Sequence, residues 1–150
     1  MSAVIENTVE ISRTPEEVFD YLADQGNEVH WNPDCVSIQK LTDGPIGVGT
    51  RFQAKWKQGP VIESTCTLFE RPRMLRYENA GRIAVVLTVT LQATPGGGTL
   101  MTSRGVWTPN GWFRLAFPVF IRVMRRAERG VIANARRALE EGLDAAAKSS

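Results

Sequence analysis

The pattern of hydrophobic and polar positions divides the chain into a β-rich first part and a helical last third. Residues 4–11 alternate between apolar and polar side chains, which is the pattern of a half-buried strand. Residues 36–108 continue as short alternating stretches separated by turns, among them a Pro-Gly-Gly-Gly turn at 95–98. Consecutive strands joined by short turns predict an antiparallel meander.

Two short helical segments interrupt the strands near the N-terminus. Thr14 can cap a helix, Pro15 suits its first position, and Glu17 completes a capping box. The pattern then breaks near Gly26, and a second short helical or irregular piece carries Trp31. We therefore expect two short helices between the first strand and the meander.

The last third of the sequence predicts one long helix. Its apolar residues recur every three or four positions, which places them on one helical face; they are Phe113, Phe117, Phe120, Met124, Ala127, Val131, Ala135, Leu139 and Leu143. Pro118 must start, kink or interrupt this helix. Over residues 118–146 it would be ~43 Å long, enough to cross a small domain. The face around Phe120, Met124, Ala127 and Val131 is expected to face the sheet.

These elements predict one α+β domain over residues 1–150. A chain of 150 residues with 43% hydrophobic and 23% charged residues is ordinary for a globular domain. About seven twisted antiparallel strands would curve around the C-terminal helix, and a single helix cannot fill the concave side everywhere. The numerous aromatic side chains could line the resulting cavity or simply fill the core.

Several segments in order along the chain resemble one known superfamily. They are TPEEVF at 14–19, WNP at 31–33, GPIGVGTRF at 44–52, ERPRML at 70–75, GGTL at 97–100 and the arginine-rich final helix. The sequence resembles the START/birch-pollen-allergen-like superfamily, in its bacterial polyketide cyclase/dehydrase and lipid-transport branch. The resemblance implies a helix-grip fold with an internal cavity, and it covers cyclases, lipid carriers, hormone receptors and allergens alike.

The predicted ligand-binding residues are mostly aromatic: Trp31, Phe52, Trp56, Tyr77, Arg104, Phe117, Phe120 and Met124. Alternation along the strand does not decide whether Arg104 points inward. An inward Arg104 could hold a carboxylate or enolate oxygen, since its guanidinium offers paired donors, and Glu63 would be its internal partner. An outward Arg104 would be a solvated residue of the convex face. No catalytic residue is assigned.

The sequence gives no reason to expect a metal or a cofactor. His30 is the only histidine, and its spacing to Glu28, Asp34 and Cys35 matches no zinc pattern. The Gly-Val-Gly at 47–49 precedes a strand and lacks the following Lys-Ser/Thr of a phosphate loop, so it is interpreted as a tight turn closing the cavity mouth.

Charge is concentrated in one region of an almost neutral chain. The net charge is +2, whereas residues 112–137 hold seven arginines and one acid, Glu128. A solvated helix face is the ordinary explanation, and an anionic membrane surface or an acidic partner is the sharper one. Nucleic acid is not expected, because the arginines are not interleaved with aromatics on a reading module.

The N-terminus lacks the pattern of a secretory signal, and the longest apolar run, 115–121, is too short for a membrane span. Cys35 and Cys66 are too far apart for a CxxC motif, so a cytoplasmic protein with reduced thiols is expected.

Three functions are weighed on this basis. The first is binding or carriage of a hydrophobic small molecule such as a lipid, polyketide or isoprenoid. The alternative is a polyketide cyclase or dehydratase acting in the same cavity, and a protein-interaction module is a third. Two or more titratable side chains converging inside the cavity would favour catalysis over carriage.

Overall fold

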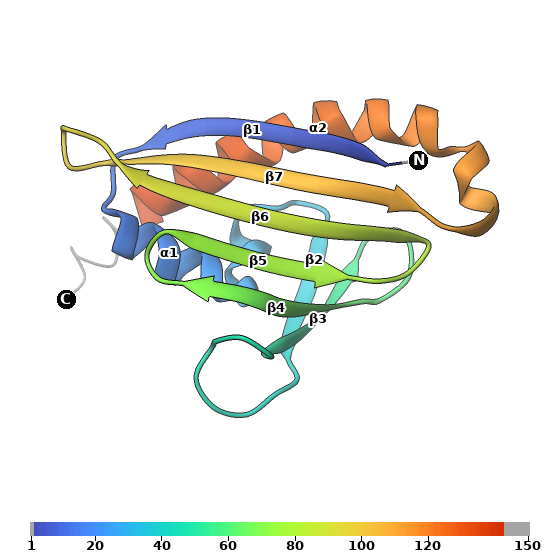
Figure 1. Ribbon diagram of the computed structural model, residues 1–150, viewed down its shortest axis with the longest axis horizontal. Helices are drawn as coiled ribbons and strands as arrows, with labels where there is room; N and C mark the ends of the chain where they lie inside the picture. The colour runs from blue at the N-terminus through green and yellow to red at the C-terminus, as the bar shows by residue number, and fades with distance from the viewer. Residues whose placement is uncertain (1, 143–150) are drawn as a thin grey trace.

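The structure is a computed structural model that describes residues 2–142, and it is built on one curved antiparallel sheet (Figure 1). Its strands are β1 (Ala3–Ile11), β2 (Cys35–Lys40), β3 (Arg51–Trp56), β4 (Ile62–Glu70), β5 (Met74–Asn79), β6 (Ile83–Ala93) and β7 (Thr99–Pro109). The order in the sheet is β1-β7-β6-β5-β4-β3-β2, a meander extended by β1 pairing with β7. The predicted fold of about seven antiparallel strands is confirmed.

The helical segments follow the predicted order. Between β1 and β2 lie α1 (Pro15–Ala23) and the 3-10 helix η1 (Gln25–His30). After β7 come η2 (Gly111–Leu115), the long helix α2 (Phe117–Arg137) and a π-helical turn, Ala138–Gly142. The last predicted helical residues, 143–146, lie outside the described part of the chain. None of the helices within residues 2–142 is long and apolar enough to cross a membrane.

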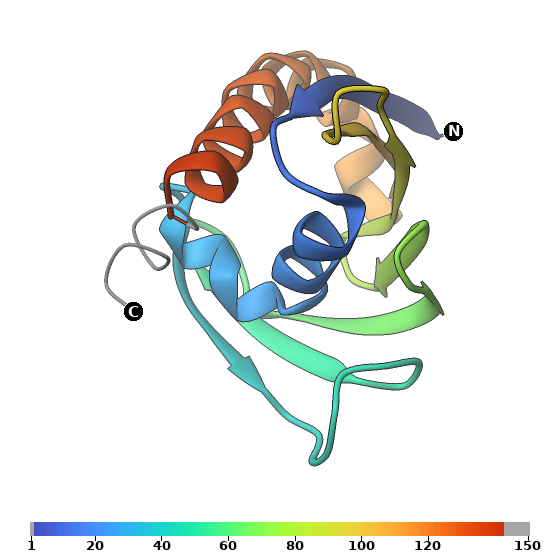
Figure 2. The ribbon, with the colours of Figure 1, turned by 90° about the vertical axis from the view of Figure 1, so that its left-hand side faces the viewer.

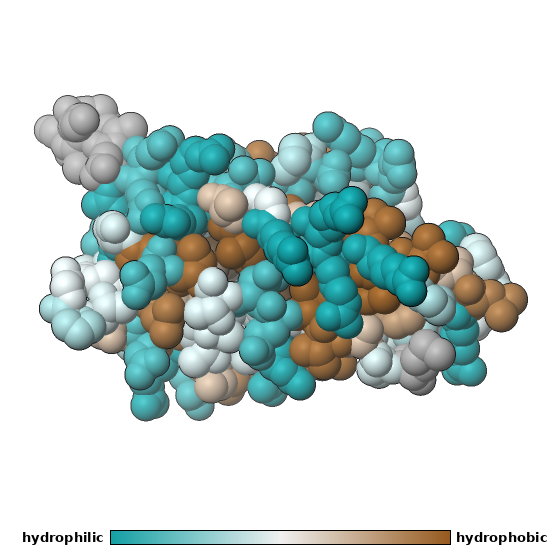
Figure 3. All heavy atoms as spheres, turned by 90° about the horizontal axis from the view of Figure 1, so that it is seen from above, coloured by the Kyte–Doolittle hydropathy of each residue, from teal (hydrophilic) through white to brown (hydrophobic). Residues whose placement is uncertain are grey.

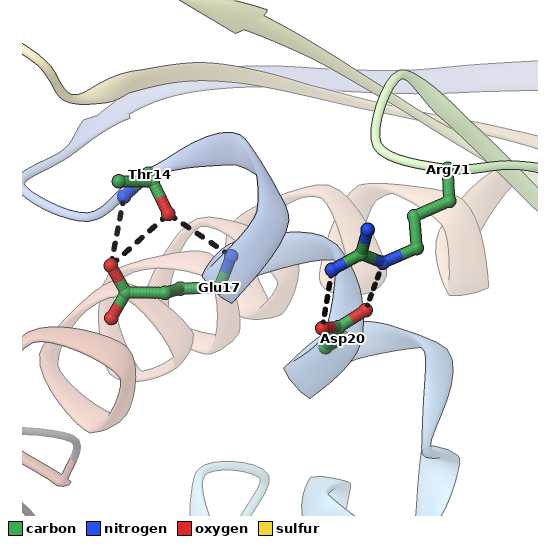
Figure 4. Close-up of polar contacts among 4 residues, drawn as sticks. All are labelled: Thr14, Glu17, Asp20 and Arg71. Carbon is green, nitrogen blue, oxygen red and sulfur yellow. Dashed lines mark hydrogen bonds and ion pairs between the residues drawn. The ribbon is translucent and has the colours of Figure 1, made fainter.

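Helix α1 begins with the predicted capping box (Figure 4). The Glu17 backbone N–H donates to Thr14 Oγ1 at 3.2 Å, and the Thr14 N–H donates to the Glu17 carboxylate at 3.4 Å. Arg71, directly after β4, donates two hydrogen bonds of 2.7 and 2.9 Å to Asp20 (Figure 4). That hydrogen-bonded guanidinium lowers the pKa of Asp20. Together these contacts fix α1 against the β4–β5 end of the sheet.

Helix α1 fills one end of the concave face, which Figure 2 shows from that end. Val18 and Phe19 are completely buried there, and the ring of Phe19 meets Phe69 edge-on with centroids 4.9 Å apart. The main hydrophobic core gathers around them from the sheet and from the end of the long helix: Ile11, Ala23, Phe52, Cys66, Leu75, Tyr77, Val89, Leu91, Met101 and Leu139.

Helix α2 covers the other part of the concave side. Pro118 lies in its first turn, where its missing N–H costs no hydrogen bond. A second, smaller cluster of Ile5, Phe117 and Ile121 packs under this N-terminal end, with Trp107 and Phe120 against it. A Cβ at Gly105 would lie 2.7 Å from Trp107 Nε1, so glycine at 105 lets the indole lie across its own strand.

Candidate ligand cavity

A cavity of about 1060 Å³ lies between the concave face of the sheet and α2. It is lined by residues of β1, α1, η1, β3 to β7, η2 and α2, together with the hairpin turns at 57–61 and 80–82. Apolar side chains predominate. The space exists because α1 reaches only one end of the curved sheet, whereas α2 bridges the rest from above (Figure 2).

Five of the eight predicted ligand-binding residues line this one cavity: Trp31, Trp56, Tyr77, Phe120 and Met124. They come from the residue that follows η1, from strands β3 and β5 and from the long helix. The predicted helix face is also correct, because Ala127 and Val131 line the cavity with Phe120 and Met124. Contact of these residues with a ligand remains a prediction.

Phe52 and Phe117 are corrections to the predicted site. They are 2% and 1% exposed and belong to the two packed clusters, not to the cavity wall. Phe52 shares a strand face with Trp56, but it lies four residues away at the end that α1 fills, where its ring meets Tyr77 edge-on at 6.0 Å. One strand face therefore contributes a core residue at one end and a cavity residue at the other.

Arg104 is a further correction, since it lies on the convex face. Its Nε is 3.9 Å from a carboxylate oxygen of Glu6 on β1, and both side chains are about half exposed. Its neighbours Ser103 and Gly105 face the cavity instead. Glu63, the predicted internal partner, pairs with Arg51 at 2.9 Å on the surface. Neither charge can therefore anchor a ligand inside the cavity.

The Gly-Val-Gly turn at 47–49 does not line the cavity, so its predicted place at the mouth is wrong. The Gly49 N–H donates to the Cys66 carbonyl oxygen at 2.8 Å, and the Gly47 N–H donates to Thr50 Oγ1 at 3.0 Å. The first bond fastens the turn to β4, and the second closes the turn itself. Gly49 has a φ of 94°, a conformation that favours glycine for reasons local to the turn.

Two carboxyl groups that are not among the predicted site residues also line the cavity: Glu28 of η1 and Glu128 of α2. Asn32 Nδ2 donates to Glu28 Oε1 at 2.8 Å. Glu128 has no hydrogen bond or ion pair with any residue of the described part. Both side chains are partly buried, and they lie close enough for the charge of one to act on the other.

Burial changes the acidity of both groups, and the charge of Glu28 adds to the change at Glu128. Burial, followed by the negative charge of Glu28, raises the pKa of Glu128 to about 7. Burial also raises the pKa of Glu28, while the hydrogen bond from Asn32 opposes that rise. Near neutrality Glu128 can therefore either donate or accept a proton.

A sequence signal for Glu128 existed. It is the only acid among residues 112–137, and it lies four residues after Met124 on the apolar face. An acid on the buried stripe of an otherwise basic helix is a reason to expect a polar group in the cavity. Glu28 had no comparable signal, since a 3-10 helix of six residues shows no clear face.

The Cys35 thiol lies near Glu28, and two indoles line the same cavity. Burial and then the Glu28 charge raise the pKa of the Cys35 thiol to about 11, so Cys35 is not a nucleophile at neutral pH. Cys35 pairs with Trp56 in the β2–β3 ladder, and Trp56 lines the same cavity as Glu28. The Nε1 atoms of Trp31 and Trp56 are buried and lack an acceptor within residues 2–142.

Other polar groups near the cavity are already engaged or exposed. The Tyr77 hydroxyl donates to the Ala23 carbonyl oxygen at 2.5 Å. Burial raises the pKa of Tyr77, so the hydroxyl stays protonated and its hydrogen bond is structural. His30 is exposed. Within the described residues no group of three or more His, Cys, Asp or Glu side chains could hold a metal ion. Burial raises the pKa of both Glu28 and Glu128, so this carboxyl pair is the candidate for proton transfer in the cavity.

Comparisons with known proteins place the chain among proteins of this architecture. A family model described as "Polyketide cyclase / dehydrase and lipid transport" matches residues 2–144. A search of curated proteins finds no significant match.

Solved structures with the same fold include three of different kinds. The Zhui aromatase/cyclase from Streptomyces sp. R1128 is 14% identical, with a TM-score of 0.71, over 93% of this chain and 96% of its own. Ara h 8.0201 is 16% identical, with a TM-score of 0.69, over 93% and 98%. The Staphylococcus aureus protein SA2116, of unknown function, is 12% identical, with a TM-score of 0.76, over 96% and 97%. At such identities the likeness concerns the fold alone.

Proposed function

The chain belongs to the polyketide cyclase/dehydrase and lipid transport family, and on that premise we propose that it binds and carries a hydrophobic small molecule in its internal cavity. The observation that supports this function is the cavity itself. Its volume of about 1060 Å³ is in the range of small-molecule sites, and its lining is mainly apolar with a few polar groups, as such sites usually are.

The mainly apolar lining of the cavity, with its few polar groups, favours a ligand that has an apolar body and at least one polar end. A lipid, a polyketide or an isoprenoid has this composition. The indole N–H groups of Trp31 and Trp56 are buried and lack an acceptor within residues 2–142, which is energetically unfavourable. A carbonyl or hydroxyl oxygen of the ligand could accept these hydrogen bonds, which favours a ligand that carries such an oxygen.

Two measurements test carriage directly. Titration with diphenylhexatriene, an uncharged apolar fluorophore, should saturate at one molecule per chain and quench tryptophan emission through Trp31 and Trp56. Native mass spectrometry of protein purified from its own host should show a co-purified ligand. Unsaturable, linear uptake of the fluorophore would contradict a defined site.

A second function, cyclisation or dehydration of a polyketide-like substrate, is favoured by one observation. Glu28 and Glu128 are two titratable groups that converge in the cavity, and a carboxyl group with a pKa near 7 is suited to general acid–base catalysis. Turnover of a poly-β-ketone analogue that is lost in Glu128→Gln, while the analogue is still bound, would select this function over carriage alone.

The outer face of α2 supports delivery at an anionic membrane surface as part of the carrier function. Arginines surround a stripe of strongly exposed apolar residues on η2 and α2; this stripe is Trp112, Leu115, Val119 and Val123. Figure 3, which looks onto the side of the molecule that carries α2, shows hydrophobic and hydrophilic side chains intermixed. Apolar and basic side chains together are typical of helices that lie on lipid headgroups.

Vesicle co-sedimentation tests this surface. Vesicles containing about one third anionic lipid should bind the protein, uncharged vesicles should not, and added salt should weaken the binding. Val119→Glu should abolish it. Equal binding to both kinds of vesicle would contradict the electrostatic part of the proposal.

A further inference from the structure

The charged groups of the cavity wall are mainly acidic, whereas residues 112–137, which form one side of the cavity, are mainly basic. The seven arginines of residues 112–137 contribute nothing to the lining, whereas the one acid of that segment does. The charged lining residues are Asp24, Glu28, Asp34, Glu78 and Glu128 against Lys57 and Arg82. The cavity is therefore acidic inside a chain whose net charge is +2.

The two basic lining residues do not neutralise the carboxyl pair. Lys57 and Arg82 belong to the hairpin turns at 57–61 and 80–82, and the Arg82 guanidinium lies 5.9 Å from the centre of the Trp112 ring. Neither forms an ion pair with Glu28 or Glu128. Within residues 2–142 no lysine or arginine forms an ion pair with either carboxyl group, and no cation offsets the effect of burial on their pKa values.

An unpaired carboxylate in a largely apolar cavity is unfavourable unless it gains a proton or a counter-ion. The Glu28–Glu128 pair has one internal donor, Asn32, and only Glu28 receives it. The faces of aromatic rings also attract cations, and Trp31 and Trp56 line the same cavity as the two carboxyl groups. Both features are complementary to a positive charge.

We propose that the cavity selects an apolar ligand carrying a basic nitrogen, whose ammonium group lies at Glu28 and Glu128 beside the indoles of Trp31 and Trp56. This proposal rests on the proposed function, because it assigns the ligand's head group within the same cavity. It disfavours a fatty acid or another carboxylate, which would bring a further negative charge to a pair that already repels itself.

Three ligands of equal chain length test the charge preference by calorimetric titration at neutral pH: decylamine, decan-1-ol and decanoate. Decylamine should bind at least about tenfold more tightly than decan-1-ol, and decanoate more weakly than either. In Glu28→Gln/Glu128→Gln the ratio of the amine affinity to the alcohol affinity should fall to about one, because the apolar contacts remain and the charge recognition is lost.

The control variant Glu10→Gln/Glu70→Gln makes the same change in net charge at two exposed positions and should keep the wild-type ratio. Thermal unfolding checks that the cavity variant folds. If that variant does not fold, the comparison of the three ligands on the wild-type protein still tests the proposal. Equal affinities for the three ligands, tightest binding of decanoate, or an unchanged ratio in the cavity variant would overturn the amine assignment. Absence of binding by all three, decan-1-ol included, would instead contradict the proposed function.

Discussion

The two ends of the concave face use similar residues for different purposes. At the α1 end, Phe19 and Phe52 are buried almost completely and pack edge-on against other rings. At the other end, Trp31 and Trp56 line a cavity of about 1060 Å³ under α2. The same strand β3 supplies Phe52 to one end and Trp56 to the other. The difference lies in α1, which fills its end of the sheet.

This comparison separates stability from binding. An apolar side chain in the packed end is surrounded by protein atoms, so its removal creates a new void. An apolar side chain in the cavity wall already borders a void, so its removal enlarges the void and affects a ligand more than the fold. Substitutions in the two ends should therefore have opposite signatures.

The largest effect on stability is expected for Phe19→Ala. Phe19 is completely buried against Phe69, and loss of a fully packed ring typically lowers the free energy of unfolding by about 3–5 kcal/mol. Phe120→Ala in the cavity wall should cost less than about 2 kcal/mol, because that ring is only partly buried. Urea unfolding of the two variants measures both values, and equal losses would refute the distinction between the ends.

The next effect concerns Glu128 and has a defined dependence on pH. Between its ordinary pKa of 4.5 and its raised pKa of about 7, the folded protein holds more of this proton than the unfolded chain does. The free energy of unfolding should therefore fall as the pH rises through that window, by at most about 3 kcal/mol, and stay low above it. Glu128→Gln should remove this loss and be more stable than wild type at pH 8.

Glu28, whose pKa burial also raises, contributes a fall in stability in the same direction, and it does so in wild type and in Glu128→Gln alike. Asp20 and Glu140 do not contribute in this window. Hydrogen bonds from Arg71 and from the Ser12 backbone lower the pKa values of Asp20 and Glu140, so their stabilising contributions disappear only as the pH falls below the ordinary values of 3.8 and 4.5. Glu10→Gln, at an exposed position, is the matched control and should leave the pH profile unchanged. Parallel pH profiles of stability for wild type and Glu128→Gln would show that the pKa of Glu128 is not raised in the folded protein.

A smaller effect is expected at the start of α1. Thr14→Ala removes the side chain that accepts the Glu17 N–H at 3.2 Å, and loss of such a cap typically costs about 1 kcal/mol. Because the cap belongs to the packed end, affinity for an apolar fluorophore should not change. Chemical denaturation measures the stability of the variant, and fluorophore titration measures its affinity. A fall in affinity that matches the fall in stability would contradict the separation of the two ends.

The smallest effect is expected for Arg104→Met on the convex face. An ion pair at 3.9 Å between two half-exposed side chains contributes little, so stability should change by less than about 0.5 kcal/mol. Binding should be unchanged for every ligand. A clear loss of affinity for decanoate alone would indicate that Arg104 contacts the ligand and would contradict its place on the convex face.

Much of the fold could be predicted from local patterns, because alternation, the Thr14 capping box and the helical spacing after residue 117 are properties of neighbouring residues. The same spacing placed Phe120, Met124, Ala127 and Val131 on the face that lines the cavity. Helix periodicity is informative here because one side of α2 is strongly charged and the other is not.

The strand residues of the site were harder to predict. Alternation shows that Ser103 and Arg104 face opposite sides but not which side is concave, and that choice depends on the curvature of the whole sheet. Phe52 and Trp56 share a face, and only the reach of α1 decides which of them borders the cavity. Glu28 and Glu128 are distant in sequence, so their mutual repulsion appears only when η1 and α2 are placed together.

A matched pair of substitutions on α2 tests the central claim most directly. Val131→Trp places a large ring in the cavity, whereas Val123→Trp makes the same change on the outer face, where Val123 is 61% exposed. Titrated with diphenylhexatriene in the absence of membranes, Val131→Trp should bind at least about fivefold more weakly than wild type, and Val123→Trp within about twofold of it. Equal affinities for the two variants, whether both weakened or both unchanged, would contradict binding within the cavity.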